Sequence, residues 1–391
     1  MEYLQETLNT PVSGEGGVAV VGGGIAGAAA ALSAARAGAQ VTLIDRGYLL
    51  GGLATAGLIA IYLPLCDGRG RQVSFGICDE LFRLSICEGP AGRVPTAWLP
   101  GGDPASRAFQ RLKVQYDPQL FALQIEQLLT ANGVRILFGT SVCAVHRAGG
   151  AVDALILENC AGRSALRVDA AVDATGDAAL CALAGEPTVR SAHGNRLSAW
   201  YYSMENGENR LHILGESDEA APAHEQAAEK LGGRRFDGLD PAQLSAALCH
   251  AHEVQREAFL AAGGVGPGHA LTTLPTLPQL RMTRRLALPF APTLAEAQAG
   301  FADSIGLIGD WRRAGPIYEL PLAALCGREN KNLFVAGRCI SVADDLWEAT
   351  RVIPAAAVTG EAAGLAAAGV PVAEALAARC VPLHASQLPP R

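Results

Sequence analysis

The chain has 391 residues, of which 50% are hydrophobic and 18% are charged, and its formal net charge is −7 at pH 7. This composition excludes a disordered chain, and because the charges are scattered rather than blocked, it predicts no nucleic-acid-binding surface. The ten cysteines form no C-x-x-C pair and have no zinc-finger spacing. They are therefore expected to be reduced thiols of a cytoplasmic protein, with no metal site and no redox-active disulfide.

Residues 1–14 lack hydrophobic periodicity and are expected to form an arm. The next segment, residues 18–46, reads VAVVGGGIAGAAAALSAARAGAQVTLIDR. Its apolar run at 18–21 predicts a buried parallel strand, its alanine-rich stretch at 26–37 predicts a helix, and its apolar run at 41–44 predicts the next strand. This order is the first half of a dinucleotide-binding fold.

Three glycines between the first strand and the helix have the G-x-G-x-x-G spacing. Gly22 allows a tight turn, Gly24 lets the backbone approach a pyrophosphate, and Gly27 permits close packing of the helix on the strand. The unpaired N–H groups at the start of the helix, around Ile25 and Ala26, favour the negative charge of the phosphates. Asp45 follows the second strand, where its carboxylate can accept hydrogen bonds from ribose hydroxyls.

Residues 16–35 carry no charge and are also about as long as a membrane-spanning helix. Consecutive glycines, the lack of a basic flank and the absence of a second such stretch favour a soluble strand and helix instead. We therefore expect no membrane span and no secretory signal.

The following elements are expected in chain order. A small-residue loop, GYLLGGLATAG, brings Gly51, Gly52, Ala54 and Thr55 near the carboxyl edge of the first strand. The later segments are an apolar stretch at 59–65, a hairpin built on Asp67-Gly68 at 66–77, a helix at 116–132 with Asp117 as its N-cap, strands at 134–138, 141–146, 152–158 and 165–168, a strand and turn at 168–177, a helix at 241–262, a strand at 332–336, a helix from Ile353-Pro354 to near Gly369, and a tail at 372–391.

These elements indicate an α/β protein in which a Rossmann-like domain contains a parallel sheet and a β-meander. This domain is expected to be discontinuous, with residues 15–65, 111–185 and 330–371. An inserted α+β domain, which would cover the substrate, is expected at 66–110 and 186–329.

Four separated pieces resemble one known family. They are the glycine pattern ending in Asp45-Arg46, the Gly51-Gly52 loop, VDATGD at 172–177, and NLFVAGRCIS at 332–341 leading to RVIPAAAVTG at 351–360. Together the pieces resemble the FAD-dependent oxidoreductases of the glutathione-reductase-like superfamily, in the branch similar to fumarate reductase flavoproteins and aspartate oxidases. Segments 64–77, 278–286 and 309–321 resemble a subgroup of these enzymes.

The resemblance implies FAD as the cofactor. The residues it implies at the cofactor are Gly22, Gly24, Ile25, Ala26, Gly27, Asp45, Arg46, Gly51, Gly52, Ala54, Thr55, Val142, Ala174, Thr175, Gly176, Gly337, Arg338 and Ile353. In this scheme Arg46 and the backbone of Val142 lie at the adenine, and Gly337 with Arg338 reaches the pyrophosphate and ribityl chain.

The same scheme directs the helix that starts at Ile353 towards flavin N1 and the C2 carbonyl. Simpler interpretations exist, because 172–176 also suits an ordinary core strand and turn, and 354–368 also suits a packing helix.

Four residues are candidates for catalysis. Arg351, just before the predicted flavin-facing helix, could orient a substrate or donate a proton. Arg281 could clamp a carboxylate together with its neighbouring arginines, or serve only in salt bridges. Tyr62 is an acid or base candidate, and the Cys66 thiol could contact the flavin or pack as a small core residue.

The predicted function is transfer of a hydride between flavin N5 and a small organic substrate by a dehydrogenase, an oxidase or a double-bond reductase. No second glycine fingerprint follows a strand, so we expect no built-in NAD(P)H domain. A flavin monooxygenase ranks second, since Arg338 and Cys339 occupy positions where that class has an acid. A flavin-free, NAD-binding Rossmann protein and a non-catalytic flavin scaffold remain further alternatives, and the oligomeric state stays open.

Overall fold

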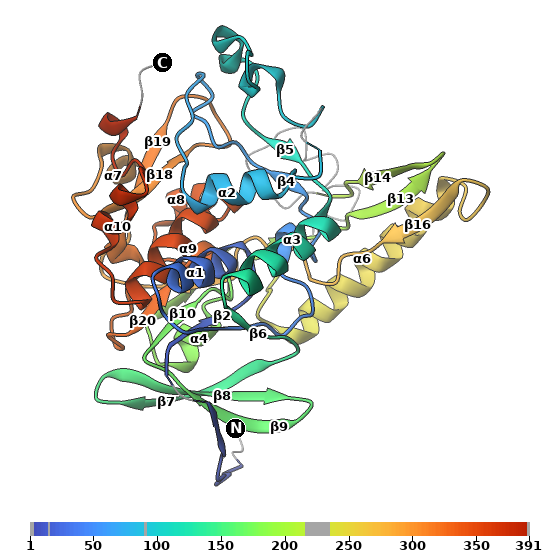
Figure 1. Cartoon of the computed structure of the whole chain (residues 1–391). Coiled ribbons are helices and arrows are strands. Elements are labelled where there is room, and N and C mark those ends of the chain that lie inside the picture. The colour runs from blue at the N-terminus through green and yellow to red at the C-terminus, as the bar shows by residue number, and fades with distance from the viewer. Residues whose placement is uncertain (1–3, 15, 90–91, 216–234, 389–391) are drawn as a thin grey trace.

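The computed structural model describes residues 4–14, 16–89, 92–215 and 235–388. Its centre is a five-stranded sheet in which every neighbouring pair is parallel (Figure 1). In spatial order the strands are β20 (Leu333–Val335), β10 (Ala170–Asp173), β2 (Val18–Val21), β3 (Val41–Ile44) and β6 (Arg135–Leu137). All residues of β2 and β10 are buried, as a parallel sheet covered on both faces requires.

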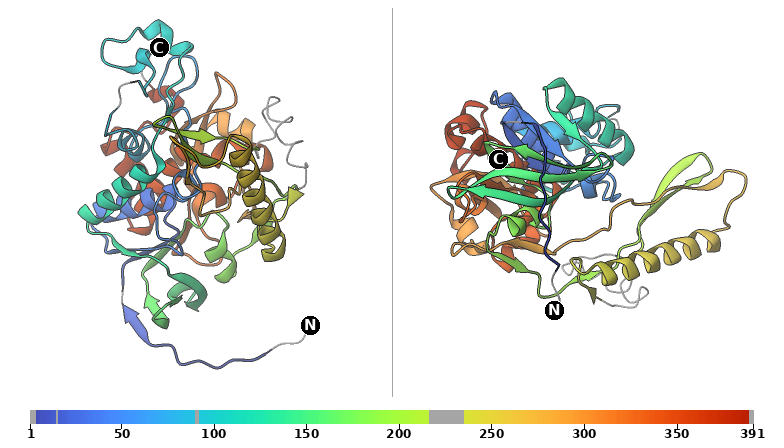
Figure 2. Two further views of the ribbon diagram at one scale, coloured as in Figure 1. Left: turned by 90° about the vertical axis from the view of Figure 1, so that its right-hand side faces the viewer. Right: turned by 90° about the horizontal axis from the view of Figure 1, so that it is seen from below.

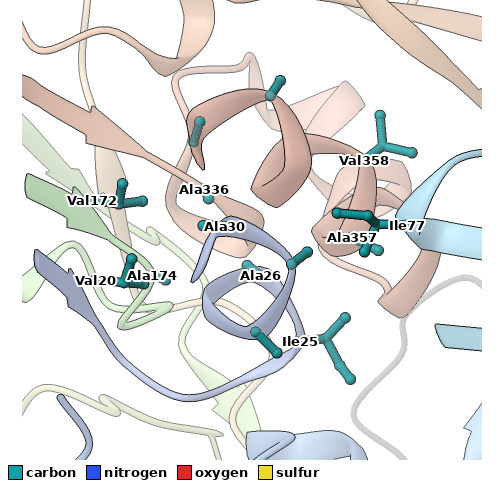
Figure 3. Close-up of a cluster of buried hydrophobic side chains, with 14 of the residues drawn as sticks. Val20, Ile25, Ala26, Ala30, Ile77, Val172, Ala174, Ala336, Ala357 and Val358 are labelled. Carbon is teal, nitrogen blue, oxygen red and sulfur yellow. The ribbon is translucent and has the colours of Figure 1, made fainter. Parts of the chain in front are cut away.

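Two alanine-rich helices lie together on one face of the sheet, α1 (Ile25–Arg36) and α9 (Ile353–Ala367). Figure 3 shows Ala26 and Ala30 of α1 between the strand residues Val20 and Val172 and the α9 residues Ala357 and Val358. Alanine favours the helix, and because its side chain is a single methyl group, the two helix backbones approach closely.

The opposite face of the sheet is covered by a four-stranded meander layer (Figure 1). Its order is β1 (Val12–Gly14), β9 (Gly162–Arg167), β8 (Ala151–Asn159) and β7 (Ser141–Ala148). β7, β8 and β9 pair antiparallel, as expected, whereas β1 pairs parallel to β9. Residues 12–14, expected in an arm, are therefore part of this layer.

Further helices pack on α1 and on the central sheet. Asp117 caps α3 (Pro118–Ala131), accepting hydrogen bonds from the backbone N–H of Gln119 and Leu120, with Pro118 at the first helical position, as the sequence predicts. The short helix α4 (Ala179–Leu183) follows β10. α2 (Ile77–Leu84), expected in the inserted domain, packs against α1, α3 and α9.

The hairpin expected at 66–77 is a tight loop with one antiparallel bridge, between Cys66 and Gln72. The Asp67 carboxylate accepts hydrogen bonds from the backbone N–H of Arg69 and Arg71. These two hydrogen bonds from the Asp67 side chain hold the turn without further pairing of its two strands.

The middle of the chain forms a projecting arm, visible on the right of Figure 1 and in the right-hand view of Figure 2. It contains the sheet of β14 (Glu208–His212), β13 (Tyr201–Glu205) and β16 (His269–Thr273), with α6 (Pro241–Ala261) alongside. Asp240 and Pro241 start α6 in the same way that Asp117 and Pro118 start α3.

The other strand pairs are β4 (Ile61–Tyr62) with β5 (Val114–Gln115), β11 (Thr188–Arg190) with β17 (Arg284–Leu286), β12 (Asn195–Arg196) with β15 (Arg235–Phe236), and β18 (Ser304–Gly309) with β19 (Ile317–Pro321). In the described residues the remaining helices are α7 (Leu294–Ala299), α8 (Asp344–Thr350) and α10 (Val372–Ala378). Short 3-10 helices are η1 (Gly52–Ala54), η2 (Thr96–Trp98), η3 (Pro104–Ala108), η5 (Leu322–Leu325), η6 (Gly337–Cys339) and η7 (Ala385–Gln387).

One hydrophobic core joins these parts. It extends from β2 and α1 to residues of the inserted segments, such as Leu81 and Leu320, and to Leu383 near the C-terminus. Over the described ranges no single helix is long and apolar enough to cross a membrane, although α9 and α10, bent by 120° at their junction, meet that test of length and composition as a pair.

Candidate cofactor-binding site

A cavity of about 310 Å³ opens where the carboxyl ends of the central strands meet the starts of α1 and α9. Its wall includes Val21, Ile44 and Ala336, each at or just after the end of a central strand. Ligands of open α/β sheets bind at this edge.

The glycine turn between β2 and α1 fits the roles expected from its spacing. Gly22 has φ +103°, and a Cβ there would lie 2.5 Å from the carbonyl oxygen of Ala174. A Cβ at Gly27 would lie 1.8 Å from the carbonyl oxygen of Gly22, so α1 packs directly on the turn. At Gly24, by contrast, no heavy atom of the described chain lies within 4 Å of that position. The space beside Gly24 belongs to the cavity and leaves room for a ligand against the backbone.

The start of α1 faces this space with unpaired donors. Its N-cap is Gly24, which has no side chain to accept the first N–H groups, and Ile25 and Ala26 line the cavity. Free N–H groups and the positive end of the helix dipole make this a site for a phosphate.

Asp45 lies at the end of β3 in the cavity wall. One carboxylate oxygen accepts a hydrogen bond from the backbone N–H of Gly23, and the other accepts one from Gly47, at 2.6 Å. Each carboxylate oxygen has a second lone pair, so these contacts orient Asp45 and leave it able to accept from ribose hydroxyls.

The turn after β10 forms another wall of the cavity, and a buried carboxylate holds this turn in place. The buried Asp173 carboxylate accepts hydrogen bonds from the backbone N–H of Thr175 at 3.0 Å, its hydroxyl at 2.7 Å, and the backbone N–H of Cys181 at 2.8 Å. Burial raises the pKa of Asp173, although these donors oppose the shift. The lining segment from Ala174 to Asp177 is thereby fixed in place.

Arg338 binds this turn from the other side. Its Nε donates to the carbonyl of Gly176 at 2.7 Å, its Nη2 donates to Asp177 Oδ1 at 2.7 Å, and its Nη1 donates to the carbonyl of Leu280. From the family resemblance, Arg338 is expected to reach the cofactor itself. In the structure the residue lines the cavity, but its guanidinium joins two walls.

Gly337 brings the returning strand close to both helices. It has φ +77°, a Cβ there would lie 2.8 Å from the Ala26 Cβ, and its N–H donates to the hydroxyl of Thr359 at 2.9 Å. The Thr359 hydroxyl donates in turn to the carbonyl of Ala355, within α9. α9 therefore positions the backbone at Gly337.

The start of α9 is the second unpaired helix terminus at the cavity. Its N-cap, Val352, has no polar side-chain atom, Pro354 lies in the first turn, and Ile353 and Ala356 are in the wall. Arg351, directly before this helix, also lines the cavity, with only 4% of its side chain exposed.

The structure brings together all of the expected cofactor residues except Gly27 and Thr55 in the lining of this cavity. Gly27 lies beneath the glycine turn. Thr55 is buried, and its hydroxyl donates to the carbonyl of Leu50, which closes the loop that carries Gly51 and Gly52.

Three of the four catalytic candidates lie outside this lining. Tyr62 is fully buried, with its hydroxyl donating to the carbonyl of Cys78 at 2.8 Å, and burial raises its pKa well above the ordinary value. Cys66 is also buried, where its sulfur accepts the backbone N–H of Leu112 at 3.2 Å. The Arg281 guanidinium lies over Trp200, 6.0 Å from the ring centroid. Of the four candidates, Arg351 is the one that lines the cavity.

Some lining residues were missed by the sequence analysis: Leu53, Thr140, Ser141, Asp177, Ala179, Leu180, Leu183, Leu277, Pro278, Leu280 and Ala356. Several adjoin expected residues, so proximity in sequence could have identified them. Leu277, Pro278 and Leu280 lie in the connection between β16 and β17, and no spacing rule links that connection to the glycine turn.

The geometry therefore defines a dinucleotide-binding protein of the α/β class. The family model for FAD dependent oxidoreductases matches residues 17–260 and 302–385. The chain belongs to this family: it is a flavoenzyme, and its cofactor is FAD.

The chain is similar to several solved structures at low sequence identity. The chain is similar to a geranylgeranyl bacteriochlorophyll reductase-like protein from Thermoplasma acidophilum (17% identity, TM-score 0.46, covering 93% of this chain and 80% of the other). It is similar to a flavocytochrome c3 fumarate reductase (14% identity, TM-score 0.42, 92% and 79%). It is also similar to p-nitrophenol 4-monooxygenase from Pseudomonas putida DLL-E4 (19% identity, TM-score 0.35, 49% and 48%), so it spans about half the length of that enzyme. No curated protein matches the sequence. These similarities assign no particular reaction.

In the described part of the chain, no three His, Cys, Asp or Glu side chains are grouped as metal ligands.

Proposed function

We propose that this flavoenzyme transfers a hydride between FAD and a small organic substrate as a dehydrogenase, an oxidase or a double-bond reductase. The observation that carries the proposal is the pair of unpaired helix starts, at Ile25 and Ile353, in the wall of one cavity. The two termini suit a ligand that carries phosphates at one end and an electron-rich ring at the other.

The residues of the wall then take distinct roles. The N–H groups at the start of α1 would bind the pyrophosphate, Asp45 would bind the ribose, and Gly24 would allow close approach. The N–H groups at the start of α9 would bind the redox-active ring. When bound, FAD supplies the group that accepts or donates the hydride.

Arg351 is the residue that we propose for orienting the substrate or for holding a proton. Among the described lining residues there is no His, Cys, Tyr, Lys or Glu. This composition supports a non-covalent cofactor, since the lining offers no imidazole, thiol or phenol to bond the ring, and it leaves Arg351 as the donor beside α9.

The first test is the absorption spectrum of the purified protein before and after acid precipitation. We expect a flavin band that passes completely into the supernatant as free FAD. A colourless protein, or colour that stays with the precipitate, would contradict the assignment of a non-covalent FAD site.

A matched pair of variants locates the cofactor. Gly24→Val fills the free space in the cavity and should abolish FAD retention. Gly266→Val makes the same change where no heavy atom of the described chain lies near, outside the cavity, and should retain FAD. Stopped-flow reduction with candidate metabolites, followed by reoxidation with and without oxygen, then separates a dehydrogenase, an oxidase and a monooxygenase.

A further inference from the structure

Arg351 is held by two residues that the proposed function does not use. Its Nε and Nη2 both donate to Glu348 Oε2, at 3.0 and 2.7 Å. Its guanidinium carbon lies 5.8 Å from the centroid of the Trp311 ring. The cation is therefore restrained by a carboxylate and by an aromatic face, a combination that suits the planar guanidinium.

The two restraining residues are themselves joined. The Trp311 indole N–H donates to the backbone carbonyl of Glu348 at 3.0 Å. Arg111 holds the backbone at Trp311, because its guanidinium donates to the carbonyl of Trp311 and to that of Asp310, both at 2.7 Å. Trp311 comes from the GDWRR segment after β18, and Glu348 belongs to α8. The restraint on Arg351 thus comes from two chain segments that are distant in sequence.

Arg351, held by Trp311 and Glu348, lies at the junction of α8 and α9, where its charge adds to the field of a helix start. Arg351 is the C-cap of α8, and α9 starts two residues later with its positive end at the same cavity. A guanidinium fixed there adds positive charge beside the helix dipole, in a place largely shielded from solvent, and the Glu348 carboxylate offsets part of that charge.

We propose that Trp311 and Glu348 are positioning residues that fix Arg351 beside the start of α9, and that the fixed cation raises the reduction potential of bound FAD. This inference rests on the proposed function. Two-electron reduction with uptake of one proton adds one negative charge to FAD, and a cation held nearby stabilises that charge.

The test measures the two-electron reduction potential of the holoenzyme, with dithionite as reductant and a reference dye. Arg351→Gln should lower the equilibrium constant for reduction about tenfold, which is about 30 mV for a two-electron couple. Trp311→Leu changes no charge, yet it should lower the potential in the same direction, whereas Trp311→Phe keeps the aromatic face and should stay near the wild type.

A double-mutant cycle separates positioning from general stability. Trp311→Leu should have no further effect on the potential once Arg351 is Gln. If it lowers the potential equally in both backgrounds, or changes only the melting temperature, the inference is wrong. Glu348→Gln removes a negative charge while an amide oxygen still accepts from Arg351, so it should raise the potential, and a fall would also overturn the inference.

The control is Glu253→Gln, an exposed position on α6, which should leave the potential unchanged. A wild-type protein that retains no FAD would refute the proposed function itself. FAD bound in every variant at one common potential would refute this inference, including the role of the Arg351 charge, and leave the proposed function intact.

Discussion

Gly360 of α9 lies directly against the carbonyl oxygen of Ala26 in the first turn of α1: a Cβ at position 360 would be 2.3 Å from that oxygen. One turn further on, a Cβ at Gly364 would lie 2.2 Å from the carbonyl oxygen of Ala30. The two helices that present their starts to the cofactor are thus in backbone contact. Their spacing, and with it the distance between the two helix starts, depends on these glycines.

Gly360→Ala should therefore destabilise the protein and weaken FAD retention. Alanine gains about 1 kcal/mol of helix propensity over glycine, but it meets a rigid backbone oxygen, and overpacking of this kind costs about 1–3 kcal/mol. The measurements are urea unfolding and the flavin absorbance kept after gel filtration. Gly266→Ala, where the Cβ meets open space, is the control, and equal losses in both variants would show that helix spacing is not responsible.

Thr359→Val tests how α9 holds Gly337. Valine has nearly the shape of threonine but cannot accept the Gly337 N–H, which would lose its 2.9 Å partner. A buried donor left unsatisfied costs about 1–3 kcal/mol, so both the free energy of unfolding and FAD affinity should fall. Thr359→Ser keeps the hydroxyl and should restore most of both. A serine variant as weak as the valine variant would point to lost packing instead.

The dinucleotide half of the fold was predictable because its signals are local. At Gly22 and Gly27 any side chain would collide with the backbone. The structure therefore requires glycine at both positions, and the G-x-G-x-x-G spacing makes this visible in the sequence. Asp117 with Pro118 likewise marks the start of α3 within four residues of sequence. The family comparison confirms the FAD cofactor.

The catalytic candidates were harder to predict because burial depends on the tertiary structure. Tyr62 lies within the apolar stretch 59–65, whose periodicity does not show whether the phenol faces the core or a ligand. Arg281 and Leu280 are neighbours, yet only Leu280 lines the cavity. The guanidinium of Arg338 is directed to Gly176, Leu280 and Asp177, and these partners lie up to 162 residues away, beyond any local pattern.

Glu361 should make the stability depend on pH. This buried carboxyl accepts the first N–H of α2, from Ile77 at 2.8 Å, and binds Arg379 at 3.1 Å, with Glu80 also nearby. Burial raises its pKa above the ordinary value of 4.5, although Ile77 and Arg379 oppose the shift. Folding therefore favours the protonated form, and the stabilisation present below the unfolded pKa is lost as the pH rises through the folded pKa.

Compared with Glu361→Gln, which cannot ionise, the wild type should lose unfolding free energy as the pH rises above about 4.5, the ordinary pKa of the side chain. Denaturant unfolding of both proteins at each pH measures this difference, and Glu253→Gln controls for exposed carboxylates. A wild-type advantage that grows with pH would mean that Arg379 and Ile77 outweigh burial.

Asp310 should make the stability depend on pH in the opposite direction to Glu361. Its side chain is fully buried, and its oxygens accept hydrogen bonds from Arg312 at 2.9 and 3.0 Å, from Arg313 at 3.2 Å and from the Tyr318 hydroxyl at 2.9 Å. Burial by itself would raise the pKa of Asp310, but these donors outweigh it and hold the pKa below the ordinary value of 3.8. The ionised form is thus the one that the folded protein stabilises.

Asp310→Asn should therefore lower the free energy of unfolding most at neutral pH. The contribution of the carboxylate is fully present above its unfolded pKa and is lost as the pH falls through its lower, folded value. The difference in unfolding free energy between the wild type and Asp310→Asn should shrink below about pH 4. Because Arg111 anchors the carbonyls of Asp310 and Trp311, the variant should also disturb Trp311, and its FAD potential should move in the direction of Trp311→Leu. A constant difference in stability across this pH range would show that lost packing, rather than charge, carries the effect.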